Sequence, residues 1–195
     1  MKHYRDQILA CDFFTVETIW LKTIYVLFFI ELGTRRIHLA GCTSHPNQIW
    51  VSQQARQLVW KLNDQAPSKQ AFLIHDHDSK FTSSFDAVFS TEGIKVIHTP
   101  YLAPRANAYA ERWVRSAREE CLDHLLILNE NHLRRVLQEY VTYYNHDRPH
   151  QGIHQHFPIS GPVRHTRGPL RKQDILGGII HNYYRQPSAP VPGTG

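Results

Sequence analysis

The sequence has few cysteines and no long apolar run. It holds only Cys11, Cys42 and Cys121, and no two of them stand at C-x-x-C spacing. This excludes a disulfide framework and gives no zinc motif. The longest apolar run covers residues 24–30, whereas a helix that spans a bilayer needs about 20 such residues. With no secretory signal pattern at the N-terminus either, we expect an intracellular protein that does not enter a membrane.

Acidic residues are scarcer than basic ones, and this imbalance points to a polyanionic partner. The 195 residues include 22 basic and 17 acidic side chains, for a net charge of +5. Residues 99–195 carry 12 of the basic and 8 of the acidic ones, and all but one of these basic residues are arginine. Arginine has the planar fork that suits phosphate groups. Nucleic acid is therefore an expected partner, and a merely solvated basic surface is the alternative that charge leaves open.

The pattern of apolar residues predicts strands first along the chain and helices last. Residues 8–16, 23–32 and 37–40 are rich in β-branched and aromatic side chains and predict a three-stranded meander. Two shorter strands are predicted at 71–75 and 95–98, and a loop between Pro100 and Pro104. Helices are predicted after Pro46, at 85–89, from 107 to 125 and around 133–144. With 42% hydrophobic residues, the chain is predicted to form one domain over 1–184 and a disordered tail over 185–195.

Three carboxylates do not fit this apolar background. Asp12 stands inside a strand pattern, where a lone carboxylate is costly unless a cation or donors accompany it, or unless the strand is at an edge. Asp76 follows a buried strand, and Asp78 competes with it two residues later. Glu111 lies beside the apolar stripe of a predicted helix. If these groups converge, hard oxygen ligands predict Mg²⁺ or Mn²⁺, and two such ions would activate a nucleophile toward a phosphodiester.

A zinc hydrolase is the alternative that the histidines suggest. His75 and His77 leave the end of a predicted strand on one face, beside Asp76 and Asp78. No third ligand follows at a recognisable spacing. We therefore interpret this cluster as a surface loop.

With three short sequence motifs, the chain resembles the integrase catalytic core of bacterial insertion-sequence transposases, relatives of retroviral integrases. They are IHDHDSKF at 74–81, AERW at 110–113 and YNHDRPH at 144–150, with 34 residues between Asp76 and Glu111. The resemblance implies a ribonuclease H-like α/β fold, a five-stranded mixed sheet flanked by helices. It also implies that Asp12, Asp76 and Glu111 are a catalytic DDE triad that binds two Mg²⁺ or Mn²⁺ ions. Asp76 takes this role over Asp78 because it directly follows the strand.

The resemblance also implies a substrate and further site residues. A transposase core would cleave DNA at the element ends and join the freed 3′-hydroxyl to target DNA. Arg115 and Arg118, on the same side of the helix as Glu111, would hold the DNA end, with Lys80 as a weaker candidate. For Arg148 and His150 we expect a structural role instead. A metal-dependent nuclease of the same fold and a non-catalytic DNA-binding or assembly protein are the alternatives.

The chain departs from the family pattern at its start. Relatives carry a helix-turn-helix region ahead of the core, whereas eleven residues precede Asp12 here. We therefore expect either a separate helix-turn-helix subunit that recognises the element ends, or a truncated copy. Bringing two DNA ends together requires at least a homodimer. The resemblance places the protein in the bacterial cytoplasm, at the nucleoid.

Overall fold

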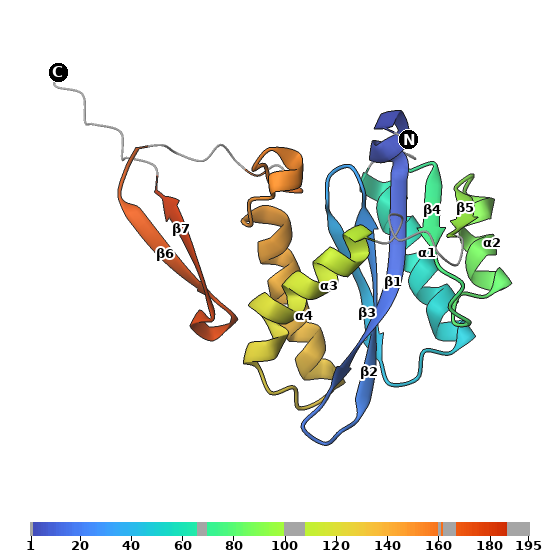
Figure 1. Cartoon of the computed structure of the whole chain (residues 1–195), viewed down its shortest axis with the longest axis horizontal. Coiled ribbons are helices and arrows are strands. Elements are labelled where there is room, and N and C mark those ends of the chain that lie inside the picture. Colours follow the sequence, from blue (N-terminus) through green and yellow to red (C-terminus); the bar gives the residue numbers. More distant parts are fainter. Residues whose placement is uncertain (1, 66–69, 100–107, 160, 162–166, 187–195) are drawn as a thin grey trace.

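Five strands form one mixed sheet at the centre of the molecule. The computed structural model describes residues 2–65, 70–99, 108–159, 161 and 167–186 (Figure 1). The strands are β1 (Ile8–Glu17), β2 (Thr23–Glu31), β3 (Ile37–Thr43), β4 (Phe72–His75) and β5 (Lys95–His98), in the order β3-β2-β1-β4-β5. The first three pair antiparallel, while β4 pairs parallel with both β1 and β5. The predicted meander and the five-stranded mixed sheet are both confirmed.

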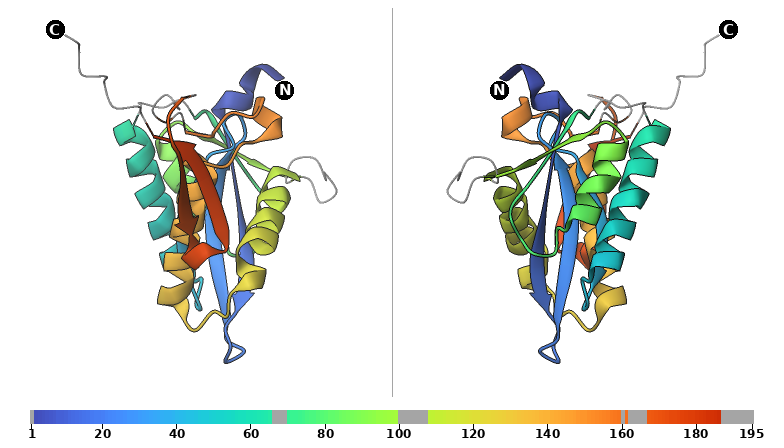
Figure 2. Two further views of the ribbon diagram at one scale, coloured as in Figure 1. Left: turned by 90° about the vertical axis from the view of Figure 1, so that its left-hand side faces the viewer. Right: turned by 90° about the vertical axis from the view of Figure 1, so that its right-hand side faces the viewer.

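Helices cover both faces of this sheet (Figures 1 and 2). On one face lie α1 (Gln48–Gln65) and α2 (Ser83–Thr91), and on the other α3 (Ala108–Glu120) and α4 (Glu130–His146). Side chains of β1 alternate between the two cores, with Leu9 and Cys11 toward α1 and α2 and with Ala10 and Phe14 toward α3 and α4. Burial on both faces explains why the strands read as continuous apolar runs. None of the described helices is long and apolar enough to cross a membrane.

An aromatic cluster fixes the orientation of α3 on the sheet. Trp113 is fully buried, with its ring centroid 4.2 Å from that of Phe28 and 5.5 Å from that of Phe14. Rings that pack at these distances contribute attraction beyond the area they bury. Glu111 is exposed on α3 beside this core. The helix ends at Glu120, before the predicted end at 125, and a short 3-10 turn over Leu122–His124 follows it.

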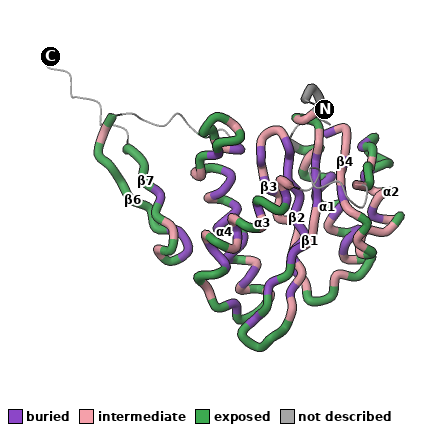
Figure 3. The backbone as a smooth tube through the Cα atoms, in the orientation of Figure 1, coloured by how far each residue is buried: buried purple, intermediate pink, exposed green. Residues whose placement is uncertain are grey.

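A C-terminal hairpin contradicts the prediction that helices come last. It consists of β6 (Leu170–Ile175) and β7 (Ile180–Arg185), which pair only with each other. Its side chains are mostly exposed, in contrast to the main sheet (Figure 3). The apolar periodicity is therefore too weak to reveal it, although Leu176 reaches the core beside α4 and its N–H donates to Glu139 Oε1 at 2.6 Å. Arg185 of the predicted tail belongs to β7, and residues 187–195 lie outside the described part of the chain.

Three side chains of the YNHDRPH motif at 144–150 make contacts inside the protein. Asn145 of α4 is buried, and its amide donates to Ile37 O and accepts from Ile37 N, both at 2.9 Å. Arg148 forms a bidentate ion pair with Glu120, with an Nη2–Oε1 distance of 2.5 Å. The buried His150 hydrogen-bonds to Tyr144 O at 3.1 Å. These contacts tie the end of α4 to β3 and to the end of α3, which is the structural role expected of Arg148 and His150.

The turn after β2 makes the stability of the fold depend on pH through Glu31. Its carboxylate hydrogen-bonds to His38 Nε2 at 2.8 Å and to Thr34 Oγ1 at 2.7 Å. Burial raises the pKa of Glu31, but these hydrogen bonds and the nearby positive charge outweigh it and leave the pKa below its ordinary 4.5. The ionised form therefore stabilises the fold above that value, and this stabilisation is lost as the pH falls through the lowered pKa.

Glu31→Gln should accordingly weaken the loss of stability on acidification. Urea unfolding of wild type and variant, at neutral pH and in the acid range, measures the difference in the free energy of unfolding at each pH. We expect the gap between the two proteins to narrow as the pH falls. A gap that stays constant would show that Glu31 contributes nothing to acid unfolding.

Candidate active site

Asp12 lies on the central strand of the sheet, so the edge-strand alternative is wrong. β1 is paired on both sides, with β2 and with β4. Asp12 stands between Ala10 and Phe14, which pack toward α3 and α4, and strand alternation places it on that face. It is half-buried, and its Oδ1 accepts a hydrogen bond from the Phe13 N–H at 2.7 Å.

The parallel pairing of β1 with β4 brings Asp76 toward Asp12. The register pairs Leu9 with Leu73 and Ala10 with Ile74. Continued for two residues past the pair of Ala10 and Ile74, which is one residue past the end of β4, this register sets Asp76 opposite Asp12. Ile74 packs on the α3 and α4 core, so the same alternation puts Asp76 on that face too.

The buried thiol of Cys11 lies near three negative charges. Burial raises the pKa of Cys11 well above its usual range, and the charges of Asp12, Asp76 and Asp86 raise it further. Asp12 in the middle of β1, Asp76 just past β4 and Asp86 of α2 thus place negative charge around Cys11. Such a region favours a cation.

Asp76 and Asp78 have different environments. Asp78 is in an ion pair with Lys80, whose Nζ lies 2.7 Å from Oδ2 and 3.0 Å from Oδ1. Its Oδ1 also accepts from the Lys80 N–H at 2.9 Å. Asp76 accepts one hydrogen bond that shapes the same turn, from the Asp78 N–H at 3.0 Å. The charge of Asp78 is thus neutralised within the loop by Lys80.

Glu111 and Asp12 line the same surface depression. Glu111 is exposed in the first turn of α3. The depression has a volume of about 430 Å³, and Arg115 and Arg118 line it as well. Asp76 is not among its lining residues, and the three carboxylates do not form a group with ligand atoms within 4.8 Å of one another. The loop predicted between Pro100 and Pro104, which precedes α3, lies outside the described residues.

The two arginines give one side of this depression a positive rim. Arg115 is exposed, whereas Arg118 is held in place by β1, since its Nη2 donates to Thr15 O at 2.8 Å. Lys80 lies on the other face of β1. Its Nζ is 5.4 Å from the centroid of the ring of Phe13, the residue that follows Asp12. Its charge is already compensated by Asp78.

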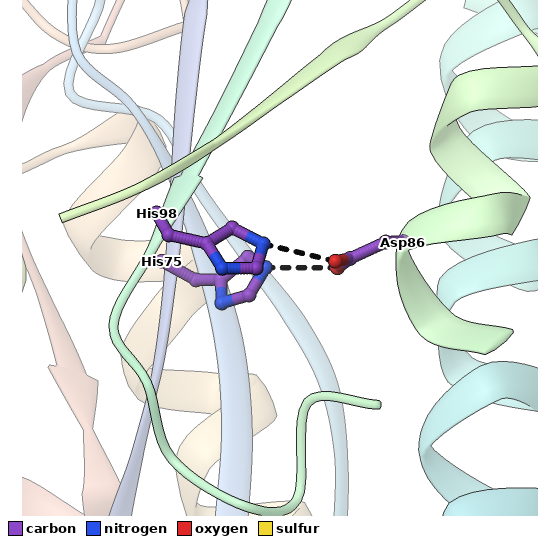
Figure 4. A group of neighbouring side chains, drawn as sticks. All are labelled: His75, Asp86 and His98. Atoms are coloured by element: carbon purple, nitrogen blue, oxygen red, sulfur yellow. Dashed lines mark hydrogen bonds and ion pairs between the residues drawn. The ribbon is translucent and has the colours of Figure 1, made fainter. Parts of the chain in front are cut away.

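The structure also reveals a cluster that the sequence analysis missed. His75 at the end of β4, Asp86 of α2 and His98 at the end of β5 place their polar atoms within 4.8 Å of one another (Figure 4). Asp86 and His98 follow His75 by 11 and 23 residues, distances that no metal motif specifies. The interpretation of this segment as a surface loop is thus wrong for His75, which is 2% exposed.

Comparison with known proteins agrees with this architecture. Residues 92–158, about a third of the chain, match the family model described as Integrase core domain. No curated protein sequence matches the chain. Among solved structures, the catalytic core domain of BIV integrase superposes with a TM-score of 0.54 at 16% identity, over 78% of this chain and 91% of that one.

A second solved structure is a chain of the simian T-cell lymphotropic virus intasome in complex with the PP2A regulatory subunit B56 gamma. It superposes with a TM-score of 0.58 at 10% identity, over 93% of this chain and 67% of that one. At these identities the likeness establishes the fold, and it confirms the ribonuclease H-like topology. Residues 92–158 therefore resemble an integrase core domain, and the chain has the fold of these two solved structures.

Proposed function

We propose that this chain is the catalytic core of a DNA transposase that cleaves DNA strands and transfers their 3′-hydroxyl ends to a target. The observation that carries the proposal is the parallel register of β1 and β4, which directs Asp76 toward Asp12 on the face of the sheet that also holds Glu111. Strand transfer by a polynucleotidyl transferase is a phosphoryl transfer, in which catalysis is mostly positioning and charge stabilisation. Carboxylates on a central strand, a neighbouring strand end and a covering helix suit that task.

The donor set of this site fits divalent cations of the Mg²⁺ or Mn²⁺ type. Asp12, Asp76 and Glu111 offer hard oxygen ligands from three elements, and the exposed Glu111 leaves room for phosphate oxygens to complete the coordination. Two such ions supply activation of the attacking hydroxyl and stabilisation of the leaving oxygen.

The remaining residues of the depression would position the DNA. Arg115 and Arg118 face the side on which a phosphodiester must lie to reach Asp12 and Glu111. Arg118 is held by Thr15 O and needs little ordering to contact a phosphate. Lys80 would contribute only if DNA displaces it from Asp78. A homo-oligomer on two DNA ends, a separate helix-turn-helix subunit and a bacterial nucleoid location belong to the same proposal.

A plasmid assay tests the proposal. The protein is incubated with Mn²⁺ or Mg²⁺, supercoiled plasmid and labelled duplexes that end in 3′-hydroxyls. We expect nicked plasmid and plasmid joined to label, with both products reduced at least about a hundredfold by Asp12→Asn, a loss of roughly 3 kcal/mol of barrier lowering. Thermal unfolding of the variant shows whether its fold is intact.

The products separate the competing functions. Nicking without joined label would replace strand transfer by the nuclease alternative. No cleavage by wild type, together with DNA binding that Asp12→Asn leaves unchanged, would favour the non-catalytic DNA-binding protein. Activity retained in a folded Asp12→Asn variant would contradict the assigned site.

A further inference from the structure

We propose that His75, Asp86 and His98 form a second metal site that binds a zinc-class transition metal ion. These residues come from three elements, the end of β4, the first turn of α2 and the end of β5 (Figure 4). They lie on the α1 and α2 side of the sheet, where Phe85 also packs, and hence apart from Glu111. The proposal does not depend on the transposase activity.

The distances between the polar atoms suit a shared cation. Asp86 lies between the two rings, with Oδ1 2.9 Å from His75 Nε2 and Oδ2 2.9 Å from His98 Nε2. The two imidazole rings lie beside each other, with centroids 4.7 Å apart. Ligand atoms around one Zn²⁺ each lie about 2.0–2.2 Å from the ion, so neighbouring ligands are a little over 3 Å apart. One ligand atom from each of the three residues already lies within 4.8 Å of the other two.

With the hydrogen bonds of His75, two acceptor atoms face each other, and a cation would satisfy both. His75 Nδ1 lies 2.6 Å from the backbone carbonyl oxygen of Asp76, which can only accept, so Nδ1 carries a hydrogen. In the neutral ring Nε2 is then an acceptor, yet it faces a carboxylate oxygen of Asp86. Two acceptors at 2.9 Å need either an extra proton or a metal ion between them. His75 is 2% exposed, and a metal would satisfy both groups without a protonated imidazole in this buried position.

The surroundings resemble those of known histidine metal sites. A histidine ligand commonly donates its other ring N–H to a backbone carbonyl, which fixes the tautomer and the direction of the ring. His75 does this to Asp76 O. The side chains of Asp86 and His98 are 23% and 43% exposed, so an ion can enter from solvent and keep water in its open positions.

The ligand types distinguish this site from the carboxylate site. Two imidazole nitrogens and one carboxylate suit Zn²⁺ or Co²⁺, whereas three carboxylates suit Mg²⁺ or Mn²⁺. A bound ion would clamp the ends of β4 and β5 to α2. Through the hydrogen bond of His75 it would also hold the backbone of Asp76, the residue proposed to act in catalysis.

Cobalt binding to the untagged protein tests the site. Co²⁺ bound by nitrogen and oxygen ligands absorbs visible light, and Zn²⁺ should displace it at one equivalent per chain. We expect His98→Asn and Asp86→Asn each to weaken binding by at least about tenfold, since losing a ligand removes a direct bond. His98 is half-exposed, so its variant should remain folded.

The matched control is a histidine–aspartate pair without a second histidine. On the terminal hairpin, His181 Nδ1 lies 2.8 Å from Asp174 Oδ1. His181→Asn should leave the cobalt band unchanged, and so should the double variant Asp12→Asn, Glu111→Gln, which alters only the carboxylate site. A wild-type protein that gives no saturable band at micromolar Co²⁺, or a band that persists in His98→Asn and Asp86→Asn, would overturn the proposal in favour of a protonated His75 paired with Asp86.

Thermal unfolding provides a second readout. Because the ion would join three elements, stoichiometric Zn²⁺ should raise the unfolding temperature of wild type. His98→Asn should abolish this rise while His181→Asn retains it. An equal rise in all three proteins would point to binding elsewhere and contradict the assignment.

Discussion

Asp76→Asn is expected to lower metal-dependent DNA cleavage about a thousandfold, which corresponds to about 4 kcal/mol of barrier lowering. Asparagine keeps the oxygen that accepts from the Asp78 N–H, so the loop should hold its shape. It removes the negative charge that would help hold a divalent cation beside Asp12. The measurement is the rate of plasmid nicking under single-turnover conditions, with thermal unfolding as the check on folding.

Asp78→Asn is the matched control for this prediction, since it makes the same chemical change two residues away. Asp78 already has its charge neutralised by Lys80, and its side chain is 26% exposed. The variant should lose only this partly exposed ion pair, worth less than about 1 kcal/mol, and should cleave DNA within a fewfold of wild type. Loss of cleavage in Asp78→Asn with activity retained in Asp76→Asn would move the proposed site by two residues.

Most of the fold could be predicted from periodicity because the central strands of the main sheet, β1 and β2, bury apolar side chains on both faces. Residues such as Phe28 and Phe29 point to opposite faces and are both fully buried, which leaves a continuous apolar run in the sequence. The terminal hairpin has no such signal. In β6 only Ile175 is buried, and the strand is defined by its pairing with β7.

The candidate site could be predicted in part. Asp12 stands out in the sequence because a carboxylate in a buried strand is energetically costly unless a cation or hydrogen-bond donors accompany it. The placement of Asp76 beside it depends on the parallel pairing of β1 with β4, which joins segments more than 60 residues apart. The partners of His75 were missed for a related reason. A zinc motif is recognised by fixed spacing within one segment, whereas Asp86 and His98 reach His75 only through the packing of α2 and β5 against β4.

Asn145→Asp is expected to destabilise the protein by roughly 2–4 kcal/mol, because it places a carboxylate in a buried position made for an amide. The Asn145 amide pairs with both backbone groups of Ile37, the first residue of the edge strand β3. Aspartate can still accept from Ile37 N, but it cannot donate to Ile37 O. Its oxygen would then face a carbonyl oxygen in a site where Asn145 is 6% exposed. Urea unfolding measures the difference in the free energy of unfolding.

The same substitution at Asn131, exposed in the first turn of α4, is the control. It should change stability by less than about 0.5 kcal/mol, since water solvates the new charge. Equal effects at the two positions would mean that the contact of Asn145 with β3 contributes little. A large effect confined to Asn145 would show that this residue of the YNHDRPH motif serves folding, because its contact attaches α4 to the edge of the sheet. This motif, which carries the resemblance to integrase cores, would then have a structural role, the attachment of α4 to the sheet. The proposed chemistry would depend on carboxylates on other elements.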